Sequence, residues 1–169
     1  MPFTIRPWRG SLWAMDAEAF WKFGHIAAMF AAVSIFVGQG LLERAVARSG
    51  DVPALRRVLA AEDRFAPLGG GLFLLGIALG VITALTGGFD LLQPWLISGY
   101  VLSAVVLITA FTYHIPTANR LKELTAASPD DPSPELRAAI DEPVGQVIVV
   151  LDSLVWLALI FVMVVKPFS

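Results

Sequence analysis

Apolar residues along this chain are concentrated in four long runs, which charged or Pro- and Gly-rich segments separate. The runs cover residues 21–42, 65–86, 95–115 and 144–165. An α-helix rises 1.5 Å per residue, so a run of about 20 residues spans the roughly 30 Å hydrocarbon core of a bilayer. The pattern therefore predicts four transmembrane helices, joined by two long loops at 43–64 and 116–143 and by one short turn.

Prolines and the short turn mark where these helices are expected to begin and end. Pro94 and Pro143 stand directly before the third and fourth runs, and Pro67 lies near the start of the second. Proline is tolerated in a first helical turn, because the N–H groups there have no helical partner. Pro116 falls where the third helix is expected to stop. The turn at 87–90 is short enough to make the second and third helices antiparallel neighbours.

The two long loops are expected to contain helical segments of their own. The first transmembrane helix should continue over 41–48, after which Asp51 can cap a separate short helix at 53–62. In the second loop, the sequence predicts a helical extension at 117–127 and a short helix at 134–140. The first short helix should lie on the membrane surface or on the bundle, and the acidic second loop should be solvated.

Composition agrees with a single membrane domain that covers residues 1–169. Hydrophobic residues make up 57% of the chain and charged residues 15%, where soluble domains carry about 25% charged residues. We therefore expect an all-α, up-down-up-down four-helix bundle in the lipid bilayer. The net charge of −2 gives no case for nucleic acid binding, and the absence of cysteine excludes a thiolate metal site.

The basic residues are unevenly distributed about the predicted helices. Eight of the twelve Lys and Arg lie in the two long loops, and the other four are Arg6, Arg9, Lys22 and Lys166. Loops rich in Lys and Arg tend to remain in the cytoplasm. This bias places both long loops in the cytoplasm and both termini outside.

Small residues recur at helical spacing within the predicted spans. Gly24 and Ala28 lie on one face of the first span, and Gly76 and Gly80 form a G-x-x-x-G pair in the second. Small residues allow the close backbone approach that holds membrane helices together. Two interpretations remain open here, packing within one chain and the contact face of a homo-oligomer.

Asp152 is the ionisable residue predicted to lie nearest the middle of the bilayer. Ser34 and Thr109 are expected at the same depth, and no Lys or Arg is available there. An ionised carboxylate without a partner would be very costly in this environment. The sequence therefore predicts an intramembrane polar site, which is either a proton or cation pathway or a neutral aspartic acid bonded between helices.

The two histidines are candidates of a different kind. His25 is expected at the depth of Met163, with Met29 one turn along its own helix, and a His–Met pair can ligate haem b. The alternative is an interfacial His25 that hydrogen-bonds to a neighbouring helix. His114 is expected at the opposite membrane boundary, roughly 22 Å from His25 along the membrane normal. The two histidines therefore cannot share one metal ion or one haem.

Several segments together resemble a family of bacterial four-helix integral membrane proteins without an assigned function. They are WKFGHIAA at residues 21–28, PWL at 94–96, YHIP at 113–116 and NRL at 119–121. That family is itself similar to copper-resistance protein D and to the HemJ-type protoporphyrinogen oxidases, in which a Lys-x-x-His supplies a haem ligand. Lys22 and His25 match that spacing. The resemblance implies a bacterial inner-membrane location and a His25 that can bind haem.

Three classes of function follow from these observations. The first is a small accessory or scaffold subunit of a membrane complex, without chemistry of its own. The second is a haem b-binding redox protein that uses His25. The third is a proton or cation pathway through Asp152. The residues that enzymes need for nucleophilic or metal catalysis do not occur at usable spacings, so an enzyme is the less favoured class.

Overall fold

The computed structural model of the chain describes residues 17–167. Arg6 and Arg9, on which part of the predicted orientation depends, lie outside this range. The helical elements, in chain order, are α1 (Ala17–Ser49), α2 (Val52–Thr86), α3 (Pro94–Thr109), the π-helical turn η1 (Ala110–His114), α4 (Ile115–Ala127), α5 (Pro134–Ile140) and α6 (Pro143–Val165). No strand occurs within residues 17–167.

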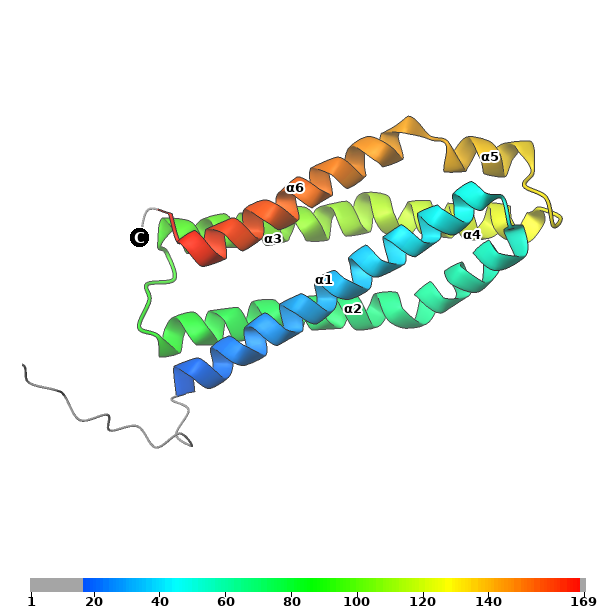
Figure 1. Cartoon of the computed structure of the whole chain (residues 1–169). Coiled ribbons are helices and arrows are strands. Elements are labelled where there is room, and N and C mark those ends of the chain that lie inside the picture. The colour runs from blue at the N-terminus through cyan, green and yellow to red at the C-terminus, as the bar shows by residue number, and fades with distance from the viewer. Residues whose placement is uncertain (1–16, 168–169) are drawn as a thin grey trace, which may run out of the picture.

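Four helical stretches are long and apolar enough to cross a membrane. They contain α1, α2, α3 with its continuation into α4, and α6. These stretches run alternately in opposite directions along one long axis (Figure 1). The structure thus confirms the predicted all-α, up-down-up-down bundle and a multi-pass membrane protein.

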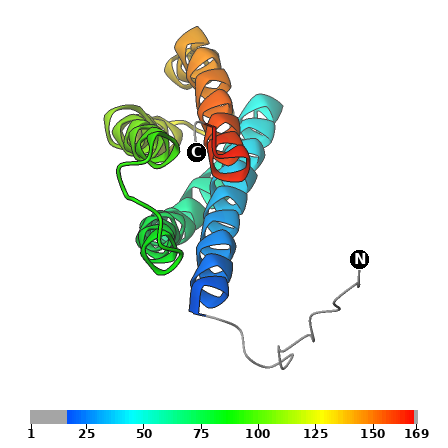
Figure 2. The ribbon, with the colours of Figure 1, turned by 90° about the vertical axis from the view of Figure 1, so that its left-hand side faces the viewer.

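The bundle is built from two helix pairs. α1 packs along α2, and α3 packs against α6, so that the pairs form two layers (Figures 1 and 2). Phe73 of α2 meets Trp156 of α6 edge to face, with 5.4 Å between the ring centroids. The layers also join near the 87–90 turn, where Ala84 of α2 lies in one apolar cluster with residues of α3 and α6. α2 and α3 run antiparallel as expected, but each packs mainly against another helix.

Small residues make the contact between α1 and α2 possible. A Cβ atom on Gly76 would lie 2.5 Å from the sulfur of Met29, and one on Gly80 would lie 2.9 Å from the His25 ring. Ala28 on the facing side of α1 is buried as well. Gly24 completes this face, since a Cβ there would lie 3.3 Å from Leu79. The G-x-x-x-G pair is therefore occupied by packing within the chain.

The prediction of a separate short helix at 53–62 is wrong, because α2 runs without a break from Val52 to Thr86. Asp51 caps it as predicted, and its carboxylate accepts the Ala54 N–H at 2.8 Å. Pro67 lies inside this helix and not at its start. A proline there removes one backbone hydrogen bond and bends the helix, and α2 changes direction between its two halves (Figure 1). Packing against α1 on both sides of the proline keeps the two halves in one helix.

The third membrane helix also continues where the sequence predicted a stop. Pro116 lies in the first turn of α4, directly after η1. In this π turn the Ile115 N–H donates to the carbonyl of Ala110, five residues back. The wider turn lets the helix pass the proline, so that α3, η1 and α4 form one continuous helical rod. The helical extension predicted at 117–127 is present as α4.

At the long-loop end, the helices extend beyond the bilayer and form what we call the cap, residues 43–64 and 115–140. α2 alone has 35 residues, or roughly 50 Å of helix, against a hydrocarbon core of roughly 30 Å. The second loop was expected to be solvated, but it folds onto the first through a small apolar core. That core consists of Ala47, Val52, Leu55, Leu59, Leu121 and Leu136.

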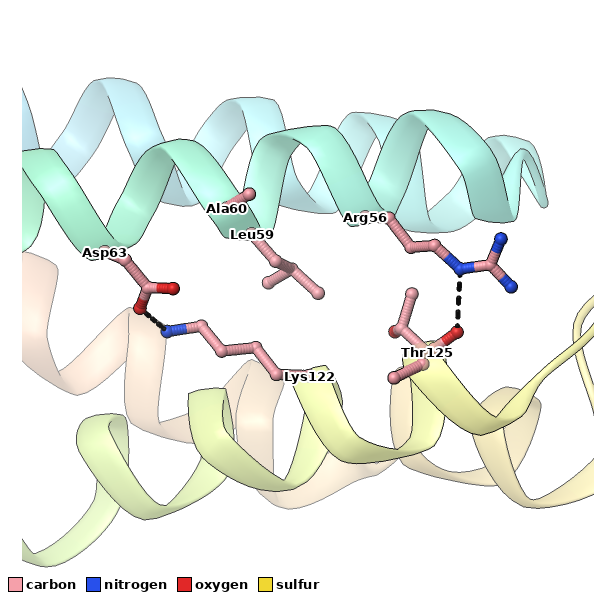
Figure 3. Close-up of a pocket in the computed structure, with 7 residues that line it drawn as sticks. Arg56, Leu59, Ala60, Asp63, Lys122 and Thr125 are labelled. Carbon is pink, nitrogen blue, oxygen red and sulfur yellow. Dashed lines mark hydrogen bonds and ion pairs between the residues drawn. The ribbon is translucent and has the colours of Figure 1, made fainter.

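Polar contacts hold the cap together around that core. Arg56 of α2 donates from Nε to the Thr125 carbonyl at 3.2 Å (Figure 3), and its Nη2 atom donates to the Ser128 and Pro129 carbonyls. These carbonyls lie at the end of α4, where helical carbonyls lack an intrahelical partner. Arg56 therefore fixes the segment that follows α4 to α2.

Candidate functional site

The most prominent polar contact in the membrane part joins His114 of η1 to Asp152 of α6. The Nε2 atom of His114 lies 2.5 Å from the Oδ2 atom of Asp152. The Asp152 side chain is 18% exposed and the His114 side chain 45% exposed. An acid and a base are thus directly bonded between two helices of the α3–α6 layer.

The register of the two helices explains how these residues meet. Met163 packs against Gly99, which places Asp152 level with Ala110, about one turn before His114. Side chains on a helix lean toward its N-terminus. Because α3 and α6 are antiparallel, the two side chains lean toward each other and close this gap.

The π turn contributes to the same contact. It adds one residue to the turn that ends at His114, and each residue rotates a helical side chain by about 100°. Without this extra residue, His114 would face a different direction. π turns are uncommon and frequently lie at functional sites.

Sequence reasoning missed this pair. Estimated depths put His114 at the membrane boundary and Asp152 near the middle of its span, because both estimates assumed straight helices. The signal that was available is Pro116, two residues after His114. A proline inside a continuing helix forces a local change of winding, and that change cannot be derived from counting residues.

The polar site predicted around Asp152 has different members in the structure. Thr109 donates to carbonyls of its own helix, to Val105 at 3.1 Å and to Val106 at 3.1 Å. Ser34 is exposed, and no hydrogen bond from its side chain occurs within the described residues. His114 is therefore the partner of Asp152, in place of the two hydroxyl groups.

The His114–Asp152 contact has a defined chemistry. A nitrogen and a carboxylate oxygen at this separation must hold one proton between them. Imidazole can accept a second proton at Nδ1 while it releases the one at Nε2. The pair can therefore take up a proton on one side and pass one on at the other.

His25 lies in a different setting, in the contact between α1 and α2. Its Nδ1 atom is 2.7 Å from the Gly76 carbonyl oxygen. A carbonyl only accepts, so Nδ1 carries a proton and donates it to Gly76. The absence of a side chain at Gly80 makes room for the ring. Among the described residues, the hydrogen bond of His25 therefore goes to backbone rather than to an ionisable group.

The arrangement around His25 does not fit a haem held between His25 and Met29. Both side chains lie against the same residue, Gly76, and the backbones of α1 and α2 approach closely there. A porphyrin between them would require the two helices to separate. Met163 packs against Gly99 of α3, in the other helix layer. The residues predicted as a ligand set are thus each engaged in helix packing.

Within residues 17–167, no group of three or more His, Cys, Asp or Glu side chains is arranged to hold a metal ion. The closest contact between titratable side chains in the membrane part is that of His114 with Asp152, two groups that can each bind a proton.

Comparisons with protein-family models, with curated proteins and with solved structures found no match for this chain. The resemblance to the four-helix bacterial family stays a prediction.

Proposed function

We propose that this protein is a small accessory subunit that contributes a proton-transfer site, the His114–Asp152 pair, to a larger assembly in the bacterial inner membrane. The observation that carries the proposal is the 2.5 Å contact between the imidazole and the carboxylate on neighbouring membrane helices. Ionisable side chains within membrane spans are expensive, and they commonly mark proton or ion pathways.

The proton step is an exchange along one hydrogen bond. A proton from the long-loop side binds to Nδ1 of His114, and the bond between Nε2 and its own proton breaks as an O–H bond forms on Asp152. The imidazole ends with one proton fewer at Nε2 and one more at Nδ1, and the aspartic acid becomes neutral. The His114 side chain is 45% exposed and lies at the end of its span nearest the cap, the side from which the first proton would reach it.

The exposure of His114 also separates this pair from a purely structural clamp. A clamp is best served by two fully enclosed partners, since water or lipid headgroups compete with an open hydrogen bond. Asp152 is mostly enclosed and His114 is open. A proton entry site requires this difference in exposure, with an open group that receives the proton and an enclosed group that accepts it next.

A partner is part of the proposal because Asp152 contacts no ionisable group other than His114 within residues 17–167. Residues 153–165 of α6 include no ionisable side chain. A proton on Asp152 therefore needs an acceptor from another subunit, from a second copy or from water that such a partner encloses. In the orientation that the basic residues predict, the proton enters from the cytoplasm.

Nitrogen NMR of the full chain in lipid nanodiscs tests the proposal directly. The chain contains two histidines, so histidine labelling gives two ring spectra, which single substitutions assign. We expect the His114 signals to respond to pH, and this response to differ in Asp152→Asn. Asp130→Asn, at an exposed cap position, is the matched control.

Infrared spectra recorded over the same pH range report on the carboxyl group. A carboxyl signal that changes with pH and disappears in Asp152→Asn supports proton exchange at the pair. A pair whose ring and carboxyl signals stay constant is a structural clamp, and that result overturns the proposal.

A further inference from the structure

A second pair of titratable groups lies in the cap, where α1 and α2 leave the bilayer. Glu62 of α2 is 9% exposed and forms a side-chain hydrogen bond with Glu43 of α1. Glu43 directly follows the first apolar run, and Glu62 lies shortly before the second. Two carboxyl groups therefore face each other in the contact between α1 and α2, outside the hydrocarbon core.

The nearest cation is committed to another residue. Lys122 of α4 reaches across to α2 and places its ammonium nitrogen 2.5 Å from an oxygen of Asp63 (Figure 3). Among residues 17–167, no Lys, Arg or His nitrogen lies within ion-pairing distance of the Glu62 carboxyl group. A buried carboxylate without a cation is unfavourable, so one of the two glutamates keeps its proton.

Five influences set the pKa of Glu62. Burial, the hydrogen bond to Glu43 and the charge of Glu43 raise its pKa to about 8, and Asp63 adds to this rise, while Lys122 opposes it. These residues are the charged groups that act on Glu62 from α1, from α2 itself and from α4. At neutral pH the pair therefore holds one proton between its two carboxyl groups.

We propose that Glu43 and Glu62 form a pH-sensitive clamp, which ties α1 to α2 while it shares a proton and loosens the cap when that proton is lost. Loss of the proton leaves the buried Glu62 carboxylate beside the partly buried Glu43 carboxylate, and the two like charges repel. Separation of α1 from α2 exposes Glu62 to water and lets the Lys122 ammonium group move between Asp63 and Glu62. This inference is independent of the proton-transfer site, because it concerns the cap and not His114.

The neighbouring packing explains why the effect should stay local. Ala47, one turn after Glu43, belongs to the apolar core of the cap with Leu55 and Leu59. Below the clamp, Ile35 and Phe36 of α1 pack closely around Gly69. Opening at Glu62 therefore loosens the first turns of α2 against α1, while the contact within the membrane remains.

The sign of the pH dependence follows from proton binding. The closed cap binds the proton more tightly than an open cap, in which Glu62 would return to an ordinary pKa of 4.5. The clamp therefore stabilises the closed cap fully below about pH 4.5 and progressively less as the pH rises toward about 8. Above that pH the dependence levels off, because Glu62 is then ionised in both states.

Hydrogen–deuterium exchange of the full chain in nanodiscs is the test, with protection factors corrected for the intrinsic pH dependence of exchange. In the wild type, amides in the first four turns of α2 should lose protection by up to about tenfold per pH unit between about pH 5 and pH 8. Glu62→Gln, which keeps the shape and a hydrogen bond but cannot ionise, should abolish this dependence.

Glu43→Gln serves as the second variant and should reduce the same dependence, so the test stands even if Glu62→Gln fails to fold. Glu123→Gln, an exposed carboxyl group on α4, is the control and should behave as the wild type. Equal pH dependence in the wild type and in both clamp variants overturns the inference.

Discussion

The two histidines of this chain occupy opposite kinds of environment, one in each helix layer. His25 is hydrogen-bonded to a backbone carbonyl in the close contact of α1 with α2, while His114 is bonded to a carboxylate between η1 and α6. A carbonyl cannot accept a proton at any ordinary pH, whereas a carboxylate can. The chemistry open to each histidine therefore follows from its partner more than from its depth, and under our proposal only His114 exchanges protons.

The largest expected effect comes from breaking the layer that contains His25. Gly76→Val places a side chain where Met29 now contacts the helix, and we expect overpacking to destabilise the fold by about 3 kcal/mol. Gly71→Val is the matched control, because a Cβ at Gly71 meets no atom within 4 Å. Thermal unfolding in detergent measures both. If the two variants unfold alike, α1 does not pack on α2 through Gly76.

The second largest loss of stability is expected in the α3–α6 layer, which contains His114. Asp152→Ala removes the partner of His114, and we expect a loss of about 2 kcal/mol, at the upper end for a hydrogen bond between membrane helices. Asp152→Asn keeps the shape and an acceptor, so it should cost less than half as much while it still removes proton exchange. Unfolding in denaturant gives the stability, and the infrared carboxyl signal gives the exchange. Equal losses in the two variants would contradict a hydrogen-bonded pair.

Much of the fold could be predicted from the sequence, because lipid imposes simple rules on apolar runs. Four runs of the right length predict four helices, and Asp51 marks the start of α2 by its capping chemistry. The positions of Pro67 and Pro116 were misjudged for one physical reason. A proline usually ends a helix, but packing on both sides of Pro67 and the π turn before Pro116 let both helices continue.

The candidate site was harder to predict than the fold. Asp152 stood out as a charge within an apolar run, but its partner depends on helix register and on one extra residue in η1. Glu43 and Glu62 lie in segments that were expected to form helices outside the hydrocarbon core, where carboxyl groups are ordinary. The burial of Glu62 depends on the packing of α2 against other helices, α1 and α4 among them. Such long-range contacts leave no local pattern in a single sequence.

A smaller effect is expected from His25 itself. His25→Leu removes the hydrogen bond to Gly76, and we expect a loss of about 1 kcal/mol, typical of one hydrogen bond. The pH response of the His114 ring should stay unchanged in this variant. His25→Gln restores an N–H donor and should recover part of the stability. A change in the His114 response would mean that the two helix layers are coupled through the bundle, and the comparison would then fail.

The smallest effect is expected at Gln39, which lies on α1 one turn before Glu43. Its side-chain nitrogen is buried and has no hydrogen-bond partner among the described residues. Removing a buried donor that is already unpaired should not destabilise the fold, so we expect Gln39→Leu to be neutral or to add up to about 1 kcal/mol of stability. Unfolding at about pH 6 and pH 9 separates two roles. A gain at both pH values identifies Gln39 as an unsatisfied packing residue, whereas a loss confined to high pH would show that its amide binds the ionised Glu43–Glu62 pair.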